Sequence, residues 1–401
     1  MTELDAASLR AAAEAALPDV IAVRRRLHRR PEIGLQLPET QAVVADELLA
    51  LGLEPRLGGT TTSVVAVIDG DRPGPTTLLR ADMDALPLTE DTGLDFASEV
   101  EGVMHACGHD THVAMLLGAA RLLVDRRAEL RGRTLLMFQP GEEGKHGARF
   151  MLEEGLLEEG PHGAGDVARA FAIHISTRYA SGVVALRPGA MLASADRIEA
   201  TVRGRGGHAS TPHLALDPVT VTAELILALQ SMITRRVDAF DPAVLTITRL
   251  AGGTTNNIIP PSVFIEGTFR TVSETQRASV RAWVDQVAAG IGAAHGAEID
   301  LLIEPGYPVT MNDPAITAWI RSLAVAIAGE SLVDDLAAPV MGAEDFSYVT
   351  QRVPGMMAFL GARSAGLDPA TAPQNHSNLV VFEEAAMATG IALYAAAALA
   401  D

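Results

Sequence analysis

Three histidines, an aspartate and the only cysteine of the chain lie within the eight residues His105-Ala-Cys-Gly-His-Asp-Thr-His112. Cys107 and His109 stand on either side of a glycine, so a tight turn can present a thiolate and an imidazole to one cation. Both groups are good ligands for Zn²⁺ and similar divalent metals. The cluster therefore favours a metal site, with a buried thiol beside surface histidines or a Cys–His nucleophile pair as the alternatives.

An acidic pair follows in the segment Gln139-Pro-Gly-Glu-Glu-Gly-Lys-His146. Adjacent side chains just past a strand point in different directions, so one of Glu142 and Glu143 can hold metal while the other faces the reaction centre. A carboxylate that binds no metal can accept the proton of a bound water. The alternative is a solvated pair at the start of the next helix, where the helix dipole favours acidic residues.

Other candidate residues carry weaker signals when each is taken alone. His174 lies in the apolar run Phe171–Ile175, and His376 precedes another apolar run; a single histidine in such a place is more often structural than a ligand. Three glycines shortly before His208 indicate a tight loop that presents an imidazole, unless this is a plain hairpin turn. Arg270 offers a planar fork for a carboxylate, although a surface arginine on an edge strand is commoner.

The elements that must position these residues alternate between strand and helix in the first half of the chain. Apolar runs predict strands at 62–68, 76–79, 134–138 and 168–175, the last ending at His174, and helices at 7–28, 38–51, 111–124 and 148–157. This alternation predicts an α/β fold with a mostly parallel sheet covered by helices on both faces. Ligands of such sheets bind at the carboxyl ends of the strands, which is where the candidate metal residues stand.

The pattern changes after Pro188. Alternating strands at 196–204, 244–249, 263–271 and 298–303, with helices at 217–237 and 274–295, follow the order βαββαβ of a ferredoxin-like sandwich. We therefore predict an inserted α+β domain at 188–305, within a domain formed by 1–187 and 306–401. From residue 312 the chain returns to a helix, a strand and a terminal helix.

Composition restricts the partners and the compartment. The formal net charge of −19 over 401 residues repels phosphate backbones and anionic lipid, so neither nucleic acid nor a membrane surface is an expected partner. One cysteine cannot form an intramolecular disulfide, which suits a reducing compartment. Neither a secretory signal nor a membrane-spanning run is visible, and we expect a cytoplasmic enzyme.

Taken in order, the motifs resemble those of the aminoacylase/carboxypeptidase family of dinuclear metallopeptidases. The resemblance is strongest to its amidohydrolase branch, which contains hippurate hydrolases and auxin-conjugate hydrolases. It rests on the ordered runs ADMDALP from residue 81, HACGHDTH from 105, QPGEEG from 139, GRGGHAS from 204, NNIIPP from 256, GTFRT from 267, GAEDF from 342 and NHS from 375.

The resemblance implies a catalytic domain interrupted by a smaller lid domain, and two divalent metal ions held by five side chains. The implied ligands are Cys107, which bridges the two ions, and His109, Glu143, His174 and His376. Glu142 matches the general base, and His208 matches a histidine that binds substrate and stabilises the oxyanion. Asn257 and Arg270 match substrate-binding positions.

The chain departs from the broader family at two positions. Asp82-Met83-Asp84 stands where most branches have His-x-Asp, and Cys107 stands where most have aspartate. Asp84 is expected to orient a ligand through a hydrogen bond, and Asp82 has no assigned role. The ligand set does not distinguish Zn, Mn, Ni and Co.

The sequence therefore predicts a metal-dependent amidohydrolase that cleaves N-acyl amino acids by attack of a metal-bound hydroxide, with Glu142 as general base. A metallo-carboxypeptidase or an N-acetyl-diaminopimelate-type deacetylase is the alternative among metal hydrolases. A cysteine-nucleophile hydrolase through Cys107, and a metal-binding protein without catalysis, are the alternatives of other classes. The resemblance also implies a homodimer or higher homo-oligomer through the lid.

Overall fold

The computed structural model describes residues 5–160 and 163–400. Contacts divide the chain into two compact units. The first unit contains the described residues up to Met191, the segment Met311–Ala338 and the described residues from Asp345 onward. The second contains Leu192–Thr310 and Pro339–Glu344. The second unit is therefore inserted into the sequence of the first.

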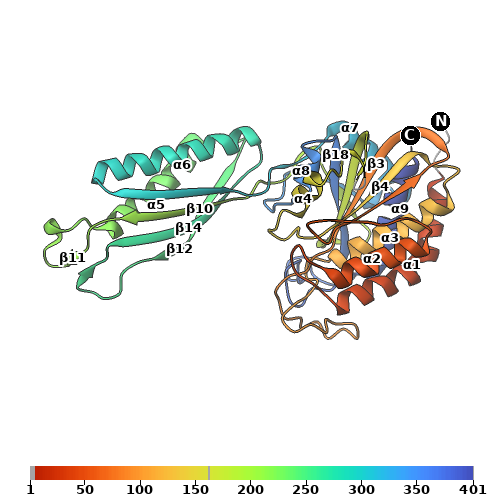
Figure 1. Cartoon of the computed structure of the whole chain (residues 1–401), viewed down its shortest axis with the longest axis horizontal. Helices are drawn as coiled ribbons and strands as arrows, with labels where there is room; N and C mark the ends of the chain where they lie inside the picture. Colours follow the sequence, from red (N-terminus) through yellow and green to blue (C-terminus); the bar gives the residue numbers. More distant parts are fainter. Residues whose placement is uncertain (1–4, 161–162, 401) are drawn as a thin grey trace. The chain divides into compact units, whose positions relative to one another are not determined.

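The described part of the first unit is built on a sheet with the strand order β1-β2-β4-β3-β7-β18-β8-β17 (Figure 1). Within it, β4, β3, β7 and β18 run parallel, whereas β2 and β8 run antiparallel to β4 and β18. The carboxyl ends of the four parallel strands therefore meet at one edge. The strands are β1 (Arg56–Leu57), β2 (Val64–Asp69), β3 (Arg72–Asp82), β4 (Arg131–Gln139), β7 (Val167–Ala180), β8 (Val184–Leu186), β17 (Val333–Asp335) and β18 (Gly355–Arg363).

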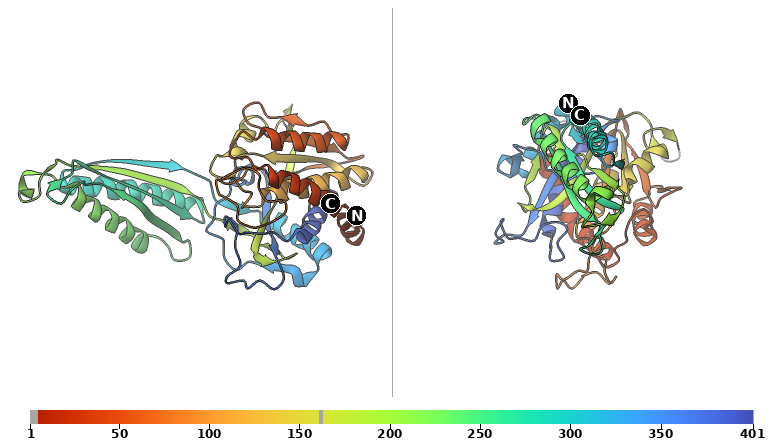
Figure 2. Two further views of the ribbon diagram at one scale, coloured as in Figure 1. Left: turned by 90° about the horizontal axis from the view of Figure 1, so that it is seen from below. Right: turned by 90° about the vertical axis from the view of Figure 1, so that its left-hand side faces the viewer.

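Helices surround this sheet (Figure 2). Residues 134–139 of β4 and 355–362 of β18 are buried without alternation, which is the signature of a sheet covered on both faces. The predicted α/β class, with a mostly parallel and helix-covered sheet, is thus confirmed. The helices of the unit are α1 (Ala6–Arg29), α2 (Pro38–Ala50), α3 (His109–Asp125), α4 (Gly147–Glu153), α7 (Pro314–Ala328), α8 (Ser347–Thr350) and α9 (Met387–Leu399).

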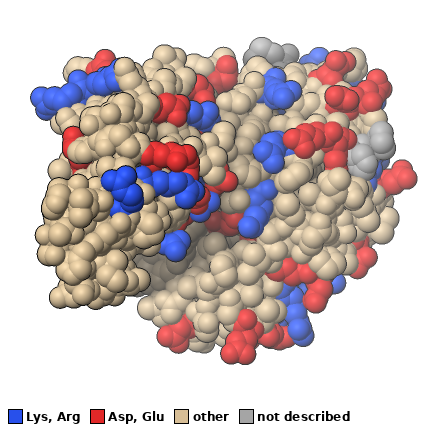
Figure 3. Space-filling model, turned by 60° about the vertical axis from the view of Figure 1, so that its left-hand side comes forward, with Lys and Arg blue, Asp and Glu red and all other residues tan. Residues whose placement is uncertain are grey.

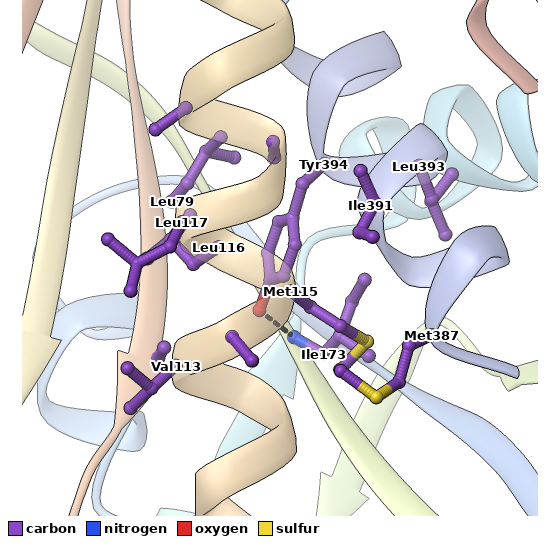
Figure 4. Close-up of a cluster of buried hydrophobic side chains, with 14 of the residues drawn as sticks. Leu79, Val113, Met115, Leu116, Leu117, Ile173, Met387, Ile391, Leu393 and Tyr394 are labelled. Carbon is purple, nitrogen blue, oxygen red and sulfur yellow. Dashed lines mark hydrogen bonds between the residues drawn. The ribbon is translucent and has the colours of Figure 1, made fainter. Parts of the chain in front are cut away.

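The core of the first unit lies where α3 and α9 pack against each other and against β3 and β7. Met115 of α3 and Ile391 of α9 meet there, beside the fully buried Tyr394 (Figure 4). The Tyr394 hydroxyl accepts a hydrogen bond from the backbone N–H of Ile173 at 3.0 Å and donates one to the carbonyl of Arg80 at 2.7 Å. The last helix thereby bridges the two central strands that lead to the candidate site.

Two predicted boundaries near the site were wrong. The strand expected to end at His174 continues to Ala180, because β18 pairs with it as far as Arg363. The helix expected from Thr111 begins at His109, because Gly108 adopts a left-handed conformation with φ 88° and the helix can start directly after it. His174 is therefore a residue within a strand, and His109 is the first residue of a helix.

The second unit has a ferredoxin-like core. Its strands are antiparallel, in the order β12-β14-β10-β15, and α5 and α6 pack against them around buried residues such as Leu225 and Phe269. The predicted α+β class of the insert is thus confirmed. The elements are β10 (Asp196–Arg203), α5 (Pro218–Arg236), β12 (Ala243–Ala251), β14 (Ser262–Thr271), α6 (Glu274–His295) and β15 (Glu298–Pro305).

Short elements complete the described chain. They are β5 (Glu159–Gly160), β6 (Gly163–Ala164), β9 (Gly189–Leu192), β11 (Gly207–His208), β13 (Ile258–Ile259), β16 (Thr310–Asn312), η1 (Pro212–Leu214), η2 (Glu330–Leu332) and η3 (Glu384–Ala386). Several long helices begin at side-chain caps that the sequence makes recognisable. Asp217, Ser273 and Asp313 accept backbone N–H groups in the first turns of α5, α6 and α7.

Charged side chains of both signs are interspersed on the face drawn in Figure 3. Basic groups on this face stand next to acidic ones rather than forming a separate basic surface, in keeping with the net charge of −19. None of the helices within the described ranges has the length and apolar content needed to cross a bilayer.

Candidate metal centre

The candidate ligands of the first unit converge on the thiol of Cys107, which is buried. Its Sγ atom lies 3.4 Å from Nε2 of His174 and 3.3 Å from Nε2 of His376. The same His376 nitrogen lies 3.2 Å from an Oε atom of Glu143. When several ligand atoms each lie about 2.0–2.3 Å from one divalent ion, the distances between them are similar to the three just given. This spacing therefore suits a metal centre.

The ligand atoms form two groups that share Cys107. One group contains Cys107, His109 and His174, the other contains Cys107, Glu143 and His376, and within each group the atoms lie within 4.8 Å of one another. The structure thus brings together all five residues expected to bind metal. The shared position of the thiol is the arrangement that a bridging ligand requires.

His109 provides a separate test of whether a cation fits. Its side chain is fully buried, and neither ring nitrogen has a hydrogen-bond partner among the described residues. The carboxylates of Asp82 and Asp84 lie 3.4 and 3.5 Å from its two nitrogens. The ring thus has acidic neighbours but no hydrogen bond of good geometry, which is costly for a buried imidazole, and a bound divalent ion would give one of its nitrogens a partner. The residues present therefore fit the metal pair that the resemblance implies.

The surroundings of the cluster shift the pKa values of its ligands. Hydrogen bonds to Cys107 and Glu143 raise the pKa of His376 to about 10. Burial raises the pKa of the Cys107 thiol, and burial lowers the pKa of His174 to about 3. A cation must displace protons from the thiol and from His376, so metal affinity should rise with pH.

The loop after β4 places the two glutamates. Asp84 accepts the backbone N–H of Glu142 at 2.9 Å with one oxygen and that of Glu143 at 3.0 Å with the other. Gly141 adopts φ 70°, and the amide of Gly144 donates to the carbonyl of Glu142 at 2.7 Å, which closes a tight turn. Glu142 is 6% exposed, and one of its carboxylate oxygens lies within 4.8 Å of a ring nitrogen of His109 and a carboxylate oxygen of Glu143, which makes a further ligand-atom group.

Asn375 holds the site in place, a role that the sequence analysis did not give it. The side-chain amide of Asn375 donates to the carbonyls of Cys107 at 3.0 Å and Ile175 at 2.9 Å. It thereby ties together the segments that carry Cys107, His174 and His376. Asn375 precedes His376 in a motif, but nothing in the sequence indicates which carbonyls its amide meets.

The second unit carries the remaining expected residues. His208 lies on β11, which pairs with β13, and the carbonyl of Asn257 accepts the backbone N–H of Ala209 at 3.1 Å. Arg270 lies on β14, is half-buried, and donates from Nη1 to the carbonyl of Met341 at 3.1 Å. His208 and Asn257 thus share one loop region, and Arg270 stands on a separate strand.

Comparison with known proteins agrees with the sequence motifs. The sequence model of peptidase family M20/M25/M40 matches residues 78–400. The chain belongs to this family. Its relatives include thermostable carboxypeptidase 2 of Saccharolobus solfataricus, which is 40% identical over 86% of each chain.

Two further relatives are named as hydrolases of other amides. An IAA-amino acid hydrolase of Arabidopsis thaliana is 36% identical over 94% of this chain and 84% of its own. An N-acetyl-L-cysteine deacetylase of Bacillus subtilis is 39% identical over 85% and 80%. A solved Bacillus subtilis structure, described as a dinuclear metal-binding peptidase of the M20 family, superposes with a TM-score of 0.82, 32% identity and coverage of 96% and 98%. This M20-family chain is therefore a metal-dependent amidohydrolase or peptidase.

Proposed function

We propose that this chain hydrolyses the amide bond of N-acyl amino acids with two divalent metal ions. The observation that carries the proposal is the pair of ligand-atom groups sharing Cys107, with the buried Glu142 beside them. Glu142 and Glu143 both lie in this cluster, and a site that only stored metal would have no use for the carboxylate that does not bind it. The names of two relatives, an IAA-amino acid hydrolase and an N-acetyl-L-cysteine deacetylase, support the substrate class.

In the proposed reaction Glu142 moves a proton. Bound divalent ions would supply a water of lowered pKa and would polarise the acyl carbonyl. Glu142 accepts a proton from the attacking water, and the oxygen of that water forms a bond to the acyl carbon. Glu142 then delivers the proton to the leaving amide nitrogen as the C–N bond breaks. Asp84 holds the backbone of both glutamates, so Glu142 keeps its position while Glu143 binds metal.

His208 is proposed to stabilise the oxyanion, and its hydrogen bonds support this role. The backbone N–H of Ser210 donates to Nδ1 of His208 at 3.1 Å. An amide N–H can only donate, so Nδ1 is an acceptor and the proton of the neutral ring lies on Nε2. The ring therefore presents an N–H donor at its outer nitrogen, as a group that binds a developing oxyanion must.

The substrate is proposed to carry a free carboxylate next to the scissile amide. Arg270 and Asn257 are the proposed binding residues, and burial lowers the pKa of Arg270 without removing its charge. A metallo-carboxypeptidase would need the same carboxylate, and the thermostable carboxypeptidase among the relatives keeps this second candidate open. An N-acetyl-diaminopimelate-type deacetylase is a third member of the same chemical class.

The deciding experiment is a substrate panel on enzyme loaded separately with Zn, Mn, Ni or Co. N-acetyl, N-benzoyl, long-chain acyl and indole-acetyl amino acids are compared with N-blocked dipeptides, and release of the free amino acid is measured. We expect faster release from at least one acyl amino acid than from any dipeptide. Faster cleavage of the dipeptides would favour the carboxypeptidase, and hydrolysis of neither would overturn the proposal.

The assembly and location of the protein are further proposals. We propose a cytoplasmic homodimer or higher homo-oligomer that associates through the lid domain 188–305, with a catalytic domain formed by 1–187 and 306–401. Val219 and Leu227 of α5 are 46% and 70% exposed, which supports an apolar contact there. Light scattering of the wild type and of Leu227→Lys tests this: the wild type should have the mass of an oligomer and the variant a lower mass. Equal masses of the two proteins would contradict the proposed contact.

A further inference from the structure

Asp82 and His112 are two chemically active residues that the proposed reaction does not use. Both are fully buried. Together with His109 they form a third group of ligand atoms within 4.8 Å of one another. This group could be a further metal site or a hydrogen-bonded pair, and the two possibilities differ in what they require of the His112 nitrogens.

The backbone decides between the two. Nε2 of His112 lies 2.7 Å from the backbone nitrogen of Ile175. An amide N–H can only donate, so this ring nitrogen is unprotonated and its lone pair is occupied. The ring proton therefore sits on Nδ1, which lies 2.5 Å from Oδ1 of Asp82 and donates to it. Neither nitrogen of His112 is left to bind a cation.

The pair occupies a gap between two central strands. Pairing of β3 with β7 ends at Arg80 and Ala172, so the amides of Ile173 and Ile175 beyond this point have no partner on β3. The Tyr394 hydroxyl fills the first position: it accepts a hydrogen bond from Ile173 (Figure 4) and donates one to the carbonyl of Arg80. His112 fills the second position.

We propose that Asp82 and His112 are positioning residues that hold the ligands His109 and His174 in place. His112 follows His109 by three residues in the first turn of α3. His112 also bonds the amide of Ile175, which adjoins His174 and whose carbonyl accepts a hydrogen bond from Nδ1 of His174 at 2.8 Å. That bond leaves Nε2 of His174 directed at Cys107. The inference rests on the proposed metal centre.

Arg80 stabilises the pair from the side away from His112. Its Nη1 donates to Oδ2 of Asp82 at 2.7 Å, and its other nitrogens donate to Gln139 at 2.8 Å and Asp345 at 3.2 Å. Removing Asp82 would therefore take away one of the two carboxylates that pair with the buried Arg80, which is itself destabilising. His112 is the better residue to substitute, because its loss removes the hydrogen bonds to Asp82 and Ile175 and leaves the Arg80–Asp82 ion pair in place.

The test compares His112→Phe with Tyr394→Phe. Each variant removes a buried polar group that bridges the same two strands, but only His112 bonds the residue, Ile175, whose carbonyl in turn accepts a hydrogen bond from the ligand His174. Metal-free protein is titrated with Co²⁺, and the thiolate-to-cobalt absorption and the bound metal are measured, with circular dichroism as the control for folding. We expect His112→Phe to bind Co²⁺ about 10–100-fold more weakly and Tyr394→Phe to bind as the wild type does, with a lower melting temperature.

Two other results would overturn the inference. One is equal loss of affinity in both variants, which would mean general destabilisation. The other is unchanged Co²⁺ affinity and absorption in His112→Phe. If that variant does not fold, His112→Gln replaces it, because glutamine keeps an acceptor and a donor. Its Co²⁺ affinity should then lie between that of the wild type and a value about 100-fold weaker, and a loss beyond about 100-fold would count against the positioning role.

A direct measurement does not depend on variants. Nitrogen-15 spectra of histidine in the wild-type protein distinguish the two ring tautomers, and His112 should show a protonated Nδ1 with and without metal. A protonated Nε2, or a shift typical of metal binding, would contradict the assignment. If the wild type itself gives no thiolate-to-cobalt absorption, the proposed metal centre fails, which is distinguishable from failure of the positioning role.

Discussion

The Nε2 atom of His376 lies 3.3 Å from Sγ of Cys107, although 269 positions separate the two residues in the chain. His376 adopts φ 70°, a left-handed conformation that costs a non-glycine residue about 1–2 kcal/mol. Its backbone N–H donates to the carbonyl of Ala106 at 2.9 Å. The surrounding contacts thus hold this histidine in a strained conformation directly against the thiol.

The two adjacent glutamates should have separable effects. Glu142→Gln removes the proposed proton carrier and should lower kcat by about 10²–10⁴-fold with metal content unchanged. Glu143→Gln removes a carboxylate from the group with Cys107 and His376, so it should lower metal content first. Turnover and bound metal are measured on the same samples, and near-normal turnover of Glu142→Gln would show that the role is wrongly assigned.

Cys107→Asp distinguishes a metal-bridging thiolate from a nucleophile. A carboxylate can bridge two cations, so this variant should keep its metal, lose the thiolate-to-cobalt absorption, and retain activity within roughly 10–100-fold of the wild type. A nucleophilic cysteine predicts loss by about 10⁴-fold or more. In addition, chelator should abolish wild-type activity and added metal should restore it; activity that survives chelation would favour the nucleophile.

Asp84→Asn should weaken the loop that carries both glutamates. One of its two accepting oxygens becomes an NH₂ group that faces a backbone N–H, which costs about 1–3 kcal/mol. We expect a lower free energy of unfolding in urea together with a lower kcat. Asp69→Asn is the control, because the side chain of Asp69 is 73% exposed and pairs with Arg133 at the surface, where such pairs contribute about 0–1 kcal/mol. Equal effects of the two variants would contradict the loop argument.

His208→Ala should lower kcat by about 10²–10³-fold, the usual effect of losing one oxyanion donor. Metal content should not change, since His208 lies in the second unit, outside the metal ligand groups. His213→Ala is the matched control, an exposed histidine in the neighbouring η1 turn. A similar loss of kcat in both variants would point to disturbance of the loop instead of a lost donor.

A buried cluster between α1 and α3 should make stability depend on pH. Burial disfavours the charged His28 ring, but the charge and hydrogen bond of Asp110 and the hydrogen bond of Glu90 outweigh it and raise the pKa to about 9. The pKa in the unfolded chain is near 6.5, so this stabilisation is fully present below that pH and is lost as the pH rises toward 9. The loss amounts to roughly 3 kcal/mol.

The His28 effect is measured as urea unfolding of metal-free protein at several pH values, for the wild type and His28→Gln. The wild type should lose more stability than the variant between about pH 6 and pH 9. Parallel pH profiles would show that His28 does not carry the effect. Asp110, whose pKa is lowered by Arg24 and His28 despite burial, contributes in the opposite direction and only at acidic pH.

Local patterns were sufficient for most elements of this fold. The predicted βαββαβ order of the insert agrees with β10 to β15, and the predicted helix 274–295 agrees with α6, because its Ser273 cap and apolar spacing are local signals. The end of β7 could not be predicted, because its last residues are strand only through their pairing with β18. The antiparallel β2 and β8 likewise depend on their neighbours.

The sequence by itself determined which side chains could bind a cation or move a proton, since residue type and close spacing are written in the chain. Only the tertiary structure decided that His174 and His376 both reach Cys107. It also decided that Asn375 holds their segments together and that both ring nitrogens of His112 are hydrogen-bonded. The physical reason is that hydrogen-bond partners and strand neighbours are set by contacts between distant segments. A local pattern specifies burial and periodicity, but it does not specify which distant segment is the partner.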